Sequence, residues 1–118
     1  MNDEQHVIER DSDMPLRFSG KAVATASSYE PGKSRWTELT LYRTTSGRYV
    51  LHEEGLTDVA GEEDRSTGWA ADDADAVIAS LYKENAAGKR YLTRTAIGLI
   101  ESAAERDDAI AAALYVEV

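Results

Sequence analysis

The sequence predicts an α+β fold, in which a small antiparallel β-sheet built on a central hairpin carries two to three helices packed on one face. Two runs rich in β-branched and aromatic residues flank a short polar segment within residues 35–54, which is typical of a β-hairpin. The clearest run of apolar residues at helical spacing begins after residue 72. Strands followed by helices along the chain indicate an α+β arrangement.

Strand alternation divides the side chains of the central hairpin between two faces. Leu39 and Leu41 point one way, whereas Trp36 and Tyr42 point the other. The polar connection ends in Gly47, which can adopt the positive φ that closes a short hairpin loop. Because a lone hairpin is marginally stable in water, other strands and helices must cover its apolar face.

The segment before the hairpin is polar at first and then extended. Residues 1–14 are acidic and poor in apolar side chains, which predicts a flexible acidic arm ahead of a single α+β domain over residues 15–118. A short alternating strand follows at residues 16–18. Residues 20–27 fit either a short helix or a continued strand. A Pro-Gly dipeptide marks a turn at residues 29–34.

Beyond the hairpin the pattern weakens until the clearest helix begins. Residues 67–70, around Trp69, form either a final edge strand or a loop that docks on the core. Asp72 can cap the first turn of the helix, and Gly88 is placed to end it. The apolar stripe of this helix follows 3.6-residue spacing and consists of Ala74, Val77, Ile78, Leu81 and Tyr82.

A second helix is predicted from about Thr93, with a stripe of Ala96, Leu99, Ile100 and Ala103. Gly98 within it either costs helix stability or marks a close approach to the sheet. Asp107 can cap a last short helix over residues 109–113. Residues 114–118 alternate in character and continue either as a closing strand or as helix.

The composition excludes several classes of protein. A chain of 118 residues with no cysteine has no disulfide scaffold, no thiol catalysis and no cysteine-based metal site, and a reducing, cytoplasmic location is expected. The first residues have neither the basic nor the apolar region of a signal peptide. No apolar run approaches the length of a membrane span, so no membrane partner is expected.

The net charge is −9, and its distribution is uneven. The formal charge is −4 over residues 1–14, +4 over 15–52, −8 over 53–75, +3 over 76–99 and −4 over 100–118. Acidic surface repels nucleic acid, so no direct binding of nucleic acid is expected. A protein partner with a basic surface fits better, although acidic excess also serves solubility alone.

No catalytic or metal-ligating set emerges, so the sequence predicts neither an enzyme nor a cofactor. The two histidines are His6 and His52, and His52 is followed by Glu53 and Glu54. Adjacent strand residues point to opposite faces and cannot converge on one metal ion without His6. The paired carboxylates have polar neighbours that would not shift a pKa for acid–base work. Nucleophile elbow, Walker and dinucleotide motifs do not occur.

Two surfaces are candidates for binding a partner. The first is formed by acidic side chains: Glu53, Glu54, Glu62, Glu63, Asp64, Asp72 and Asp73. Among the acids in residues 53–75, only those at the start of the helix have an expected structural role, and serine or asparagine would serve as well in the loop. The second surface is the strand face of Trp36 and Tyr42, which is either open to a partner or covered by the arm or by residues 57–69.

The chain resembles small uncharacterised proteins carried by bacterial phages, plasmids and integrative elements. The resemblance extends from about Leu16 to Leu114, and its motifs are Arg35-Trp36-Thr37-Glu38-Leu39, Leu41-Tyr42-Arg43-Thr44, Ser46-Gly47-Arg48-Tyr49-Val50, Tyr91-Leu92-Thr93, and Ala103-Ala104-Glu105-Arg106-Asp107 with Ile110. It names no activity. It implies a genetic context in which small acidic proteins inhibit host defence, anti-CRISPR proteins among them.

Two functional hypotheses follow. In the first, the protein is a non-enzymatic inhibitor, for example an anti-CRISPR or other anti-defence protein, whose acids take the place of phosphates in a basic nucleic-acid channel of a host complex. In the second, it is an accessory or regulatory subunit that docks through the Trp36 and Tyr42 face. Electrostatic capture weakens with salt, whereas an aromatic contact does not. The sequence carries no signal for an oligomeric state.

Overall fold

The computed structural model describes residues 4–115 and confirms the α+β fold. Over these residues a five-stranded antiparallel sheet of order β1–β2–β3–β4–β5 stands beside a two-stranded sheet, β6–β7, and three helices. The elements are β1 (Glu4–Arg10), β2 (Asp13–Ser27), β3 (Arg35–Thr44), β4 (Tyr49–Thr57), β5 (Arg65–Ala71), α1 (Ala74–Leu81), β6 (Lys83–Glu84), β7 (Arg90–Tyr91), α2 (Arg94–Ala104) and α3 (Asp108–Ala113).

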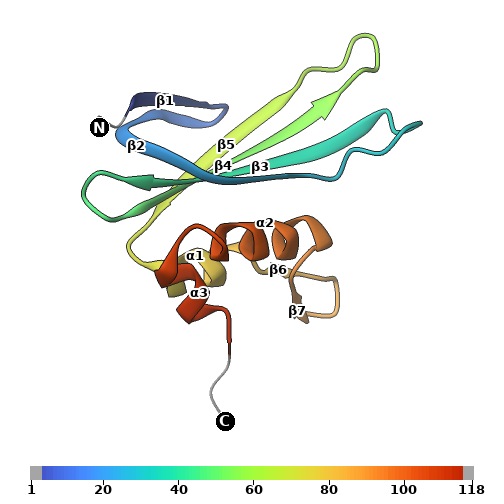
Figure 1. Ribbon diagram of the computed structural model, residues 1–118. Coiled ribbons are helices and arrows are strands. Elements are labelled where there is room, and N and C mark those ends of the chain that lie inside the picture. Colours follow the sequence, from blue (N-terminus) through green and yellow to red (C-terminus); the bar gives the residue numbers. More distant parts are fainter. Residues whose placement is uncertain (1–3, 116–118) are drawn as a thin grey trace.

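The predicted hairpin is the centre of the sheet. Strands β3 and β4 pair from Arg35↔Thr57 to Arg43↔Tyr49, and Gly47 has a φ of 90° in the connection. All three helices lie on one face of this sheet (Figure 1). As strand alternation predicts, Leu39 and Leu41 point to the helices. The main core combines them with side chains of the helices and of β2, β4 and β5, including Val23, Leu51, Ala71, Val77, Leu99 and Ile110.

The N-terminal segment differs from the flexible arm expected for residues 1–14. Residues 4–10 form β1, which pairs with β2 and folds with it over the outer face of the sheet, the face turned away from the helices (Figure 1). Ile8 is only 3% exposed there. Few residues of this N-terminal segment are apolar. Leu16 and Phe18 of β2 pack with them and complete a second, smaller core, which the composition of residues 1–14 alone does not reveal.

The sequence allowed either a helix or a continued strand for residues 20–27. They continue the strand, which makes β2 long. A Cβ at Gly20 would lie 2.3 Å from the carbonyl oxygen of Arg43, so only glycine permits this approach of the two backbones. Within residues 4–115, β2 pairs with β1 up to Gly20 and with β3 from Gly20 to Ser27. The β1–β2 hairpin can therefore turn over the sheet at this position.

The turned hairpin returns to the far edge of the sheet. The amide of Asp11 donates to the carbonyl of Ser66 at 2.9 Å, and the guanidinium of Arg10 donates to the carbonyl of Gly68 at 3.2 Å. A Cβ at Gly68 would lie 3.2 Å from Ile8, which shows how closely the layers approach. The sheet is therefore curled, with β1 beside β5.

Helix α1 is shorter than predicted. Its N-cap is Asp73 and not Asp72, and it ends at Leu81 instead of continuing towards Gly88. The segment after it forms the β6–β7 hairpin, in which Gly88 has a φ of 83°. The side chain of Asn85 accepts hydrogen bonds from two amides of this turn, at 2.9 and 3.0 Å. An Asx-type turn therefore replaces the last predicted helical turn.

Helices α2 and α3 begin where the sequence predicts. Thr93 caps α2, whose stripe is buried, and Asp107 caps α3. A Cβ at Gly98 would meet nothing within 4 Å, so Gly98 does not mark a close approach to the sheet. Helix α3 ends at its C-cap Leu114, while residues 116–118 of the predicted alternating tail lie outside the described residues.

Candidate functional site

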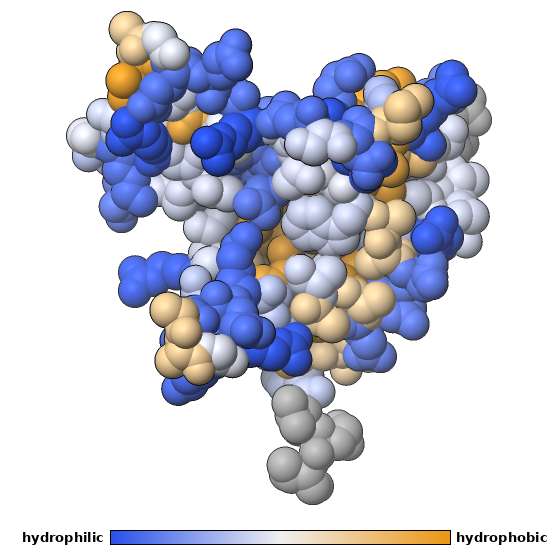
Figure 2. All heavy atoms as spheres, turned by 180° about the vertical axis from the view of Figure 1, so that it is seen from behind, coloured by the Kyte–Doolittle hydropathy of each residue, from blue (hydrophilic) through white to orange (hydrophobic). Residues whose placement is uncertain are grey.

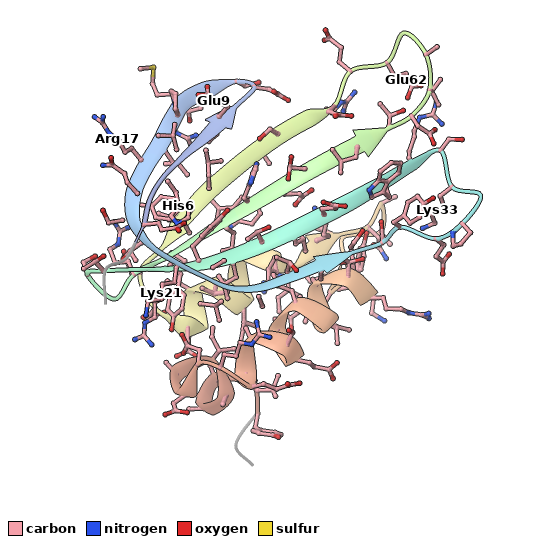
Figure 3. The ribbon with its side chains drawn as sticks, turned by 45° about the horizontal axis from the view of Figure 1, so that its top comes forward. His6, Glu9, Arg17, Lys21, Lys33 and Glu62 are labelled. Carbon is pink, nitrogen blue, oxygen red and sulfur yellow. The ribbon has the colours of Figure 1, made fainter. Side chains whose placement is uncertain are left out.

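The predicted acidic residues do not form one surface. Glu62, Glu63 and Asp64 lie in the β4–β5 loop, whereas Asp72 and Asp73 follow the other end of β5. The pairs Gly55↔Arg65 and Tyr49↔Ala71, which bound this ladder, are separated by about 20 Å at ~3.3 Å per residue. Figure 3 shows Glu62 at the far tip of the sheet, away from the helices. The −8 charge of residues 53–75 is therefore spread along the sheet, since the loop acids and the acids before α1 lie at opposite ends and Glu53 and Glu54 lie on β4 between them.

The acids at the helical end have structural partners. Asp73 accepts a hydrogen bond from the amide of Ala76 at 2.8 Å and so caps α1. Asp72 forms an ion pair with Arg48 at 2.8 Å. These contacts agree with the expected capping role for this group of acids, with Asp73 as the cap.

The neighbours Glu53 and Glu54 point to opposite faces of β4, as strand alternation predicts. On the helix face, Glu53 lies 3.7 Å from the ammonium of Lys83. On the outer face, Glu54 lies 4.0 Å from Nδ1 of His52. One partner surface cannot contact both carboxylates in the same way.

Two of the three loop acids, Glu62 and Asp64, stabilise the loop itself, which differs from the expectation that they have no structural role there. Glu62 forms a two-point ion pair with Arg35 and accepts a hydrogen bond from Thr57 at 2.7 Å. The hydrogen bond from Arg35, followed by that from Thr57, lowers the pKa of Glu62. Asp64 accepts from the backbone amide of Thr57 at 3.0 Å. Serine in these positions could not reproduce the charged contact between Glu62 and Arg35.

The two aromatic residues of the outer face have different environments. Tyr42 is covered by the N-terminal hairpin, since its ring lies 4.8 Å from that of His6 and 5.2 Å from that of Phe18. Burial, followed by the charge of Glu54, raises the pKa of Tyr42. Trp36 lies beyond the hairpin, where its indole N–H donates to Glu38 at 3.2 Å. The N-terminal hairpin therefore covers Tyr42, whereas Trp36 is half-buried against Tyr29 and is not covered by that hairpin.

Trp36 and the loop acids line one open hollow of about 1360 Å³, here called the outer hollow. It lies between the turn of the β1–β2 hairpin and the β4–β5 loop, and Figure 3 shows Glu9 of β1 and Glu62 on either side. Its charged and aromatic lining consists of Asp11, Arg35, Trp36, Glu62, Glu63, Asp64 and Arg65. These residues bring part of the acidic surface and part of the aromatic surface together.

Sequence reasoning missed Asp11, which lines this hollow, and Tyr29, which packs on Trp36. Asp11 was assigned to a flexible arm, and its place opposite the loop depends on a contact with Ser66, 55 residues later. Tyr29 packs edge-to-face on Trp36 with ring centroids 4.9 Å apart and remains 52% exposed. Its position follows from the Pro-Gly turn, which returns the chain to Trp36, so a register argument could have found it.

A buried polar network joins the sheet to α3. Asp107 is 4% exposed and accepts hydrogen bonds from the hydroxyl of Tyr49, from Arg43, and from the amides of Ala109 and Ile110. Burial, followed by the hydrogen bond to Asp107, raises the pKa of Tyr49 to about 12. Protein donors occupy the acceptor sites of Asp107, so we assign this network a structural role.

Within residues 4–115, no group of three or more potential ligands is placed to hold a metal ion. None of the helices described is long and apolar enough to cross a membrane. Comparisons with protein families, with curated proteins and with solved structures find no match.

Proposed function

We propose that this protein is a binding protein without catalytic activity, and that its outer hollow receives a basic segment of a partner protein. The observation that carries this proposal is the placement of Trp36 beside Glu62, Glu63 and Asp64 at one hollow. Tryptophan and tyrosine dominate the energy of many interfaces, and Trp36 is held by contacts to Tyr29 and Glu38 before any partner binds. A pre-positioned side chain loses little entropy on binding.

The charge of the hollow supports a basic occupant. Four acids and two arginines line it, which gives a formal charge of −2. Arg35 is engaged by Glu62, and within residues 4–115 no hydrogen bond or ion pair holds Glu63, so its carboxylate is free to meet an incoming cation. Lysine or arginine side chains of a partner could pair with Glu63 and Asp64 and stack on Trp36.

The role that we propose for this binding is inhibition of a nucleic-acid-binding complex of the host, as in an anti-CRISPR or other anti-defence protein. The mobile-element resemblance, the acidic excess and the small size support this role. The separation of the acids into two groups favours insertion of a basic segment into the hollow over mimicry of a continuous row of phosphates.

The test uses a fluorescent peptide that alternates lysine or arginine with glycine, titrated with the full-length protein at several salt concentrations. Trp36→Ala and Glu63→Gln should each weaken binding at least several-fold. The matched control is Glu101→Gln, which removes the same charge from an exposed position on α2. Equal losses in Glu63→Gln and Glu101→Gln would mean that net charge, and not the outer hollow, attracts the peptide.

A second function is favoured by the aromatic pair alone. If Trp36 and Tyr29 anchor a partner without help from the acids, the protein acts as an accessory subunit that docks through this edge of the outer face. Purification of partners from the native host with the wild type, Trp36→Ala and Glu63→Gln as baits separates the two. A partner lost only with Trp36→Ala and retained at high salt supports docking, whereas one lost with both variants and released by salt supports electrostatic capture.

A further inference from the structure

A second recess opens between the sheet and the helices, and it meets the outer hollow at Ser28 and Thr37. This inter-layer recess has a volume of about 260 Å³, and the residues that matter most for its chemistry are Leu39, Glu53, Trp69, Leu81, Lys83 and Thr95. Figure 2 shows apolar atoms deep in the hollow between the two layers. The volume suits a small molecule or a single long side chain.

Glu53 is the unusual member of this lining. On the helix-facing side of β4, the preceding residues Tyr49 and Leu51 are 1% and 0% exposed, and Glu53 occupies the next position of the same row. A carboxylate there interrupts an otherwise apolar face and loses hydration without any gain in packing. Such interruptions of a consistent pattern are expected where a site is maintained.

The carboxylate of Glu53 is incompletely satisfied. It forms an ion pair with the ammonium of Lys83 at 3.7 Å, which is too long for a hydrogen bond, and within residues 4–115 no group donates a hydrogen bond to it. The Glu53 side chain is 26% exposed, whereas that of Lys83 is 50% exposed on a flexible stem. Glu53 therefore retains acceptor capacity, and its counter-ion can move aside.

We propose that the inter-layer recess binds an organic cation, namely an ammonium or guanidinium group on a short apolar stem, with Glu53 as its counter-ion. The stem lies against Leu39 and Leu81, and the charged group lies between Glu53 and the ring of Trp69. A guanidinium donates two hydrogen bonds to the carboxylate where Lys83 makes none, so the exchange is favourable. This inference does not depend on the function proposed for the outer hollow.

The experiment titrates the full-length ¹⁵N-labelled protein with n-butylguanidinium and follows backbone and indole N–H signals. We expect saturable shifts at Trp69 and Thr95. The neutral isostere n-butylurea and the anion butyrate should bind at least tenfold more weakly. Absence of saturable shifts with n-butylguanidinium, or equal binding of n-butylurea or butyrate, would overturn the proposal.

Two variants with opposite expected effects sharpen the test. Glu53→Gln should weaken binding of n-butylguanidinium at least tenfold, whereas Lys83→Met, which keeps the stem and removes the competing charge, should tighten it several-fold. Glu54→Gln is the matched control, because Glu54 points to the other face of β4. Wild-type affinity in Glu53→Gln, or no gain in Lys83→Met, contradicts the assignment, and the second variant remains informative if the first folds poorly.

Acetyl-arginine amide then distinguishes the two sources of such a cation. Binding as tight as that of n-butylguanidinium assigns the recess to an arginine or lysine side chain of a protein. Exclusion of the bulkier probe assigns it to a free amine or guanidine.

Discussion

At the residue scale, the buried Asp107 connects the two halves of the fold. It caps α3 and at the same time accepts the hydroxyl of Tyr49 on β4 and the guanidinium of Arg43 on β3. Burial of a carboxylate is costly unless its charge is paired and its oxygen atoms accept hydrogen bonds. Asp107 accepts hydrogen bonds from four donors, one of which is the charged Arg43. The cap of a six-residue helix therefore also fixes where that helix sits on the sheet.

The Tyr49–Asp107 contact predicts a pH dependence. The pKa of Tyr49 is about 12 in the folded protein and about 10 in an unfolded chain, so its stabilising contribution is complete below about pH 10 and is lost as the pH rises towards about 12. The unfolding free energy of the wild type should fall with pH over that range. In Tyr49→Phe the slope of this fall should be smaller by an amount that corresponds to up to about one proton. Urea denaturation at a series of pH values measures this, and an unchanged slope would contradict it.

Leu41 tests the assignment of strand faces. It is 1% exposed in the main core, so Leu41→Ala should lower the free energy of unfolding by about 2–5 kcal/mol through lost burial and a residual cavity. Chemical denaturation provides the measurement, with Thr40→Ala on the opposite face for comparison. A loss below about 1 kcal/mol for Leu41→Ala would mean that the site collapses or is not buried.

At the element scale, the course of β2 decides the shape of the outer face. The strand pairs with β1 up to Gly20 and with β3 from Gly20 onwards, so one strand belongs to two ladders. The backbone contact with Arg43 at this position leaves no room for a side chain. Without the turn of the hairpin, Tyr42 would lose its contacts with His6 and Phe18, and the outer hollow would lose the wall that contains Asp11.

Gly20→Ala should therefore destabilise the protein by about 1–3 kcal/mol, because the new Cβ would have to displace backbone rather than a flexible side chain. Gly55→Ala is the matched control within the same sheet, since its nearest neighbour would be a side-chain carbon of Arg65 at 3.7 Å. Thermal and urea unfolding of both variants compares them directly. Equal effects would contradict this assignment, because alanine at Gly55 meets only an ordinary contact and should be neutral or slightly stabilising.

At the scale of the whole molecule, one sheet separates two cores. The main core lies under the helices, and the smaller one, with Ile8 and the Tyr42 cluster, lies under the β1–β2 hairpin. Each tryptophan reports one side, since Trp69 packs on the main core and Trp36 lies on the outer face. Both cores share β3 and β4, so unfolding of one core should destabilise the other.

We therefore predict that both sides unfold in one transition. Single-tryptophan variants, Trp36→Phe and Trp69→Phe, allow the fluorescence of each side to be followed separately in urea. After correction for the stability of each variant by circular dichroism, the fluorescence midpoints should coincide with the loss of secondary structure. An earlier transition of the Trp36 signal would show that the β1–β2 hairpin detaches as an independent unit.

The sequence by itself determined the elements whose signals are local. The central hairpin, the buried stripe of α2 and the caps Thr93 and Asp107 each depend on residues within a few positions of one another, and the structure has them as predicted. The inward direction of Leu39 and Leu41 follows from alternation alone. Local backbone geometry and side-chain period suffice for these features.

Only the tertiary structure decided which surfaces are open. Tyr42 and Trp36 share one strand face, yet His6 covers only Tyr42. His6 reaches this position because β1 pairs with β2 and folds with it over the outer face of the sheet. The acids that are close in sequence separate because β5 carries Asp72 away from Glu62 along its length. Such outcomes depend on contacts between residues far apart in the chain, which neither composition nor periodicity encodes.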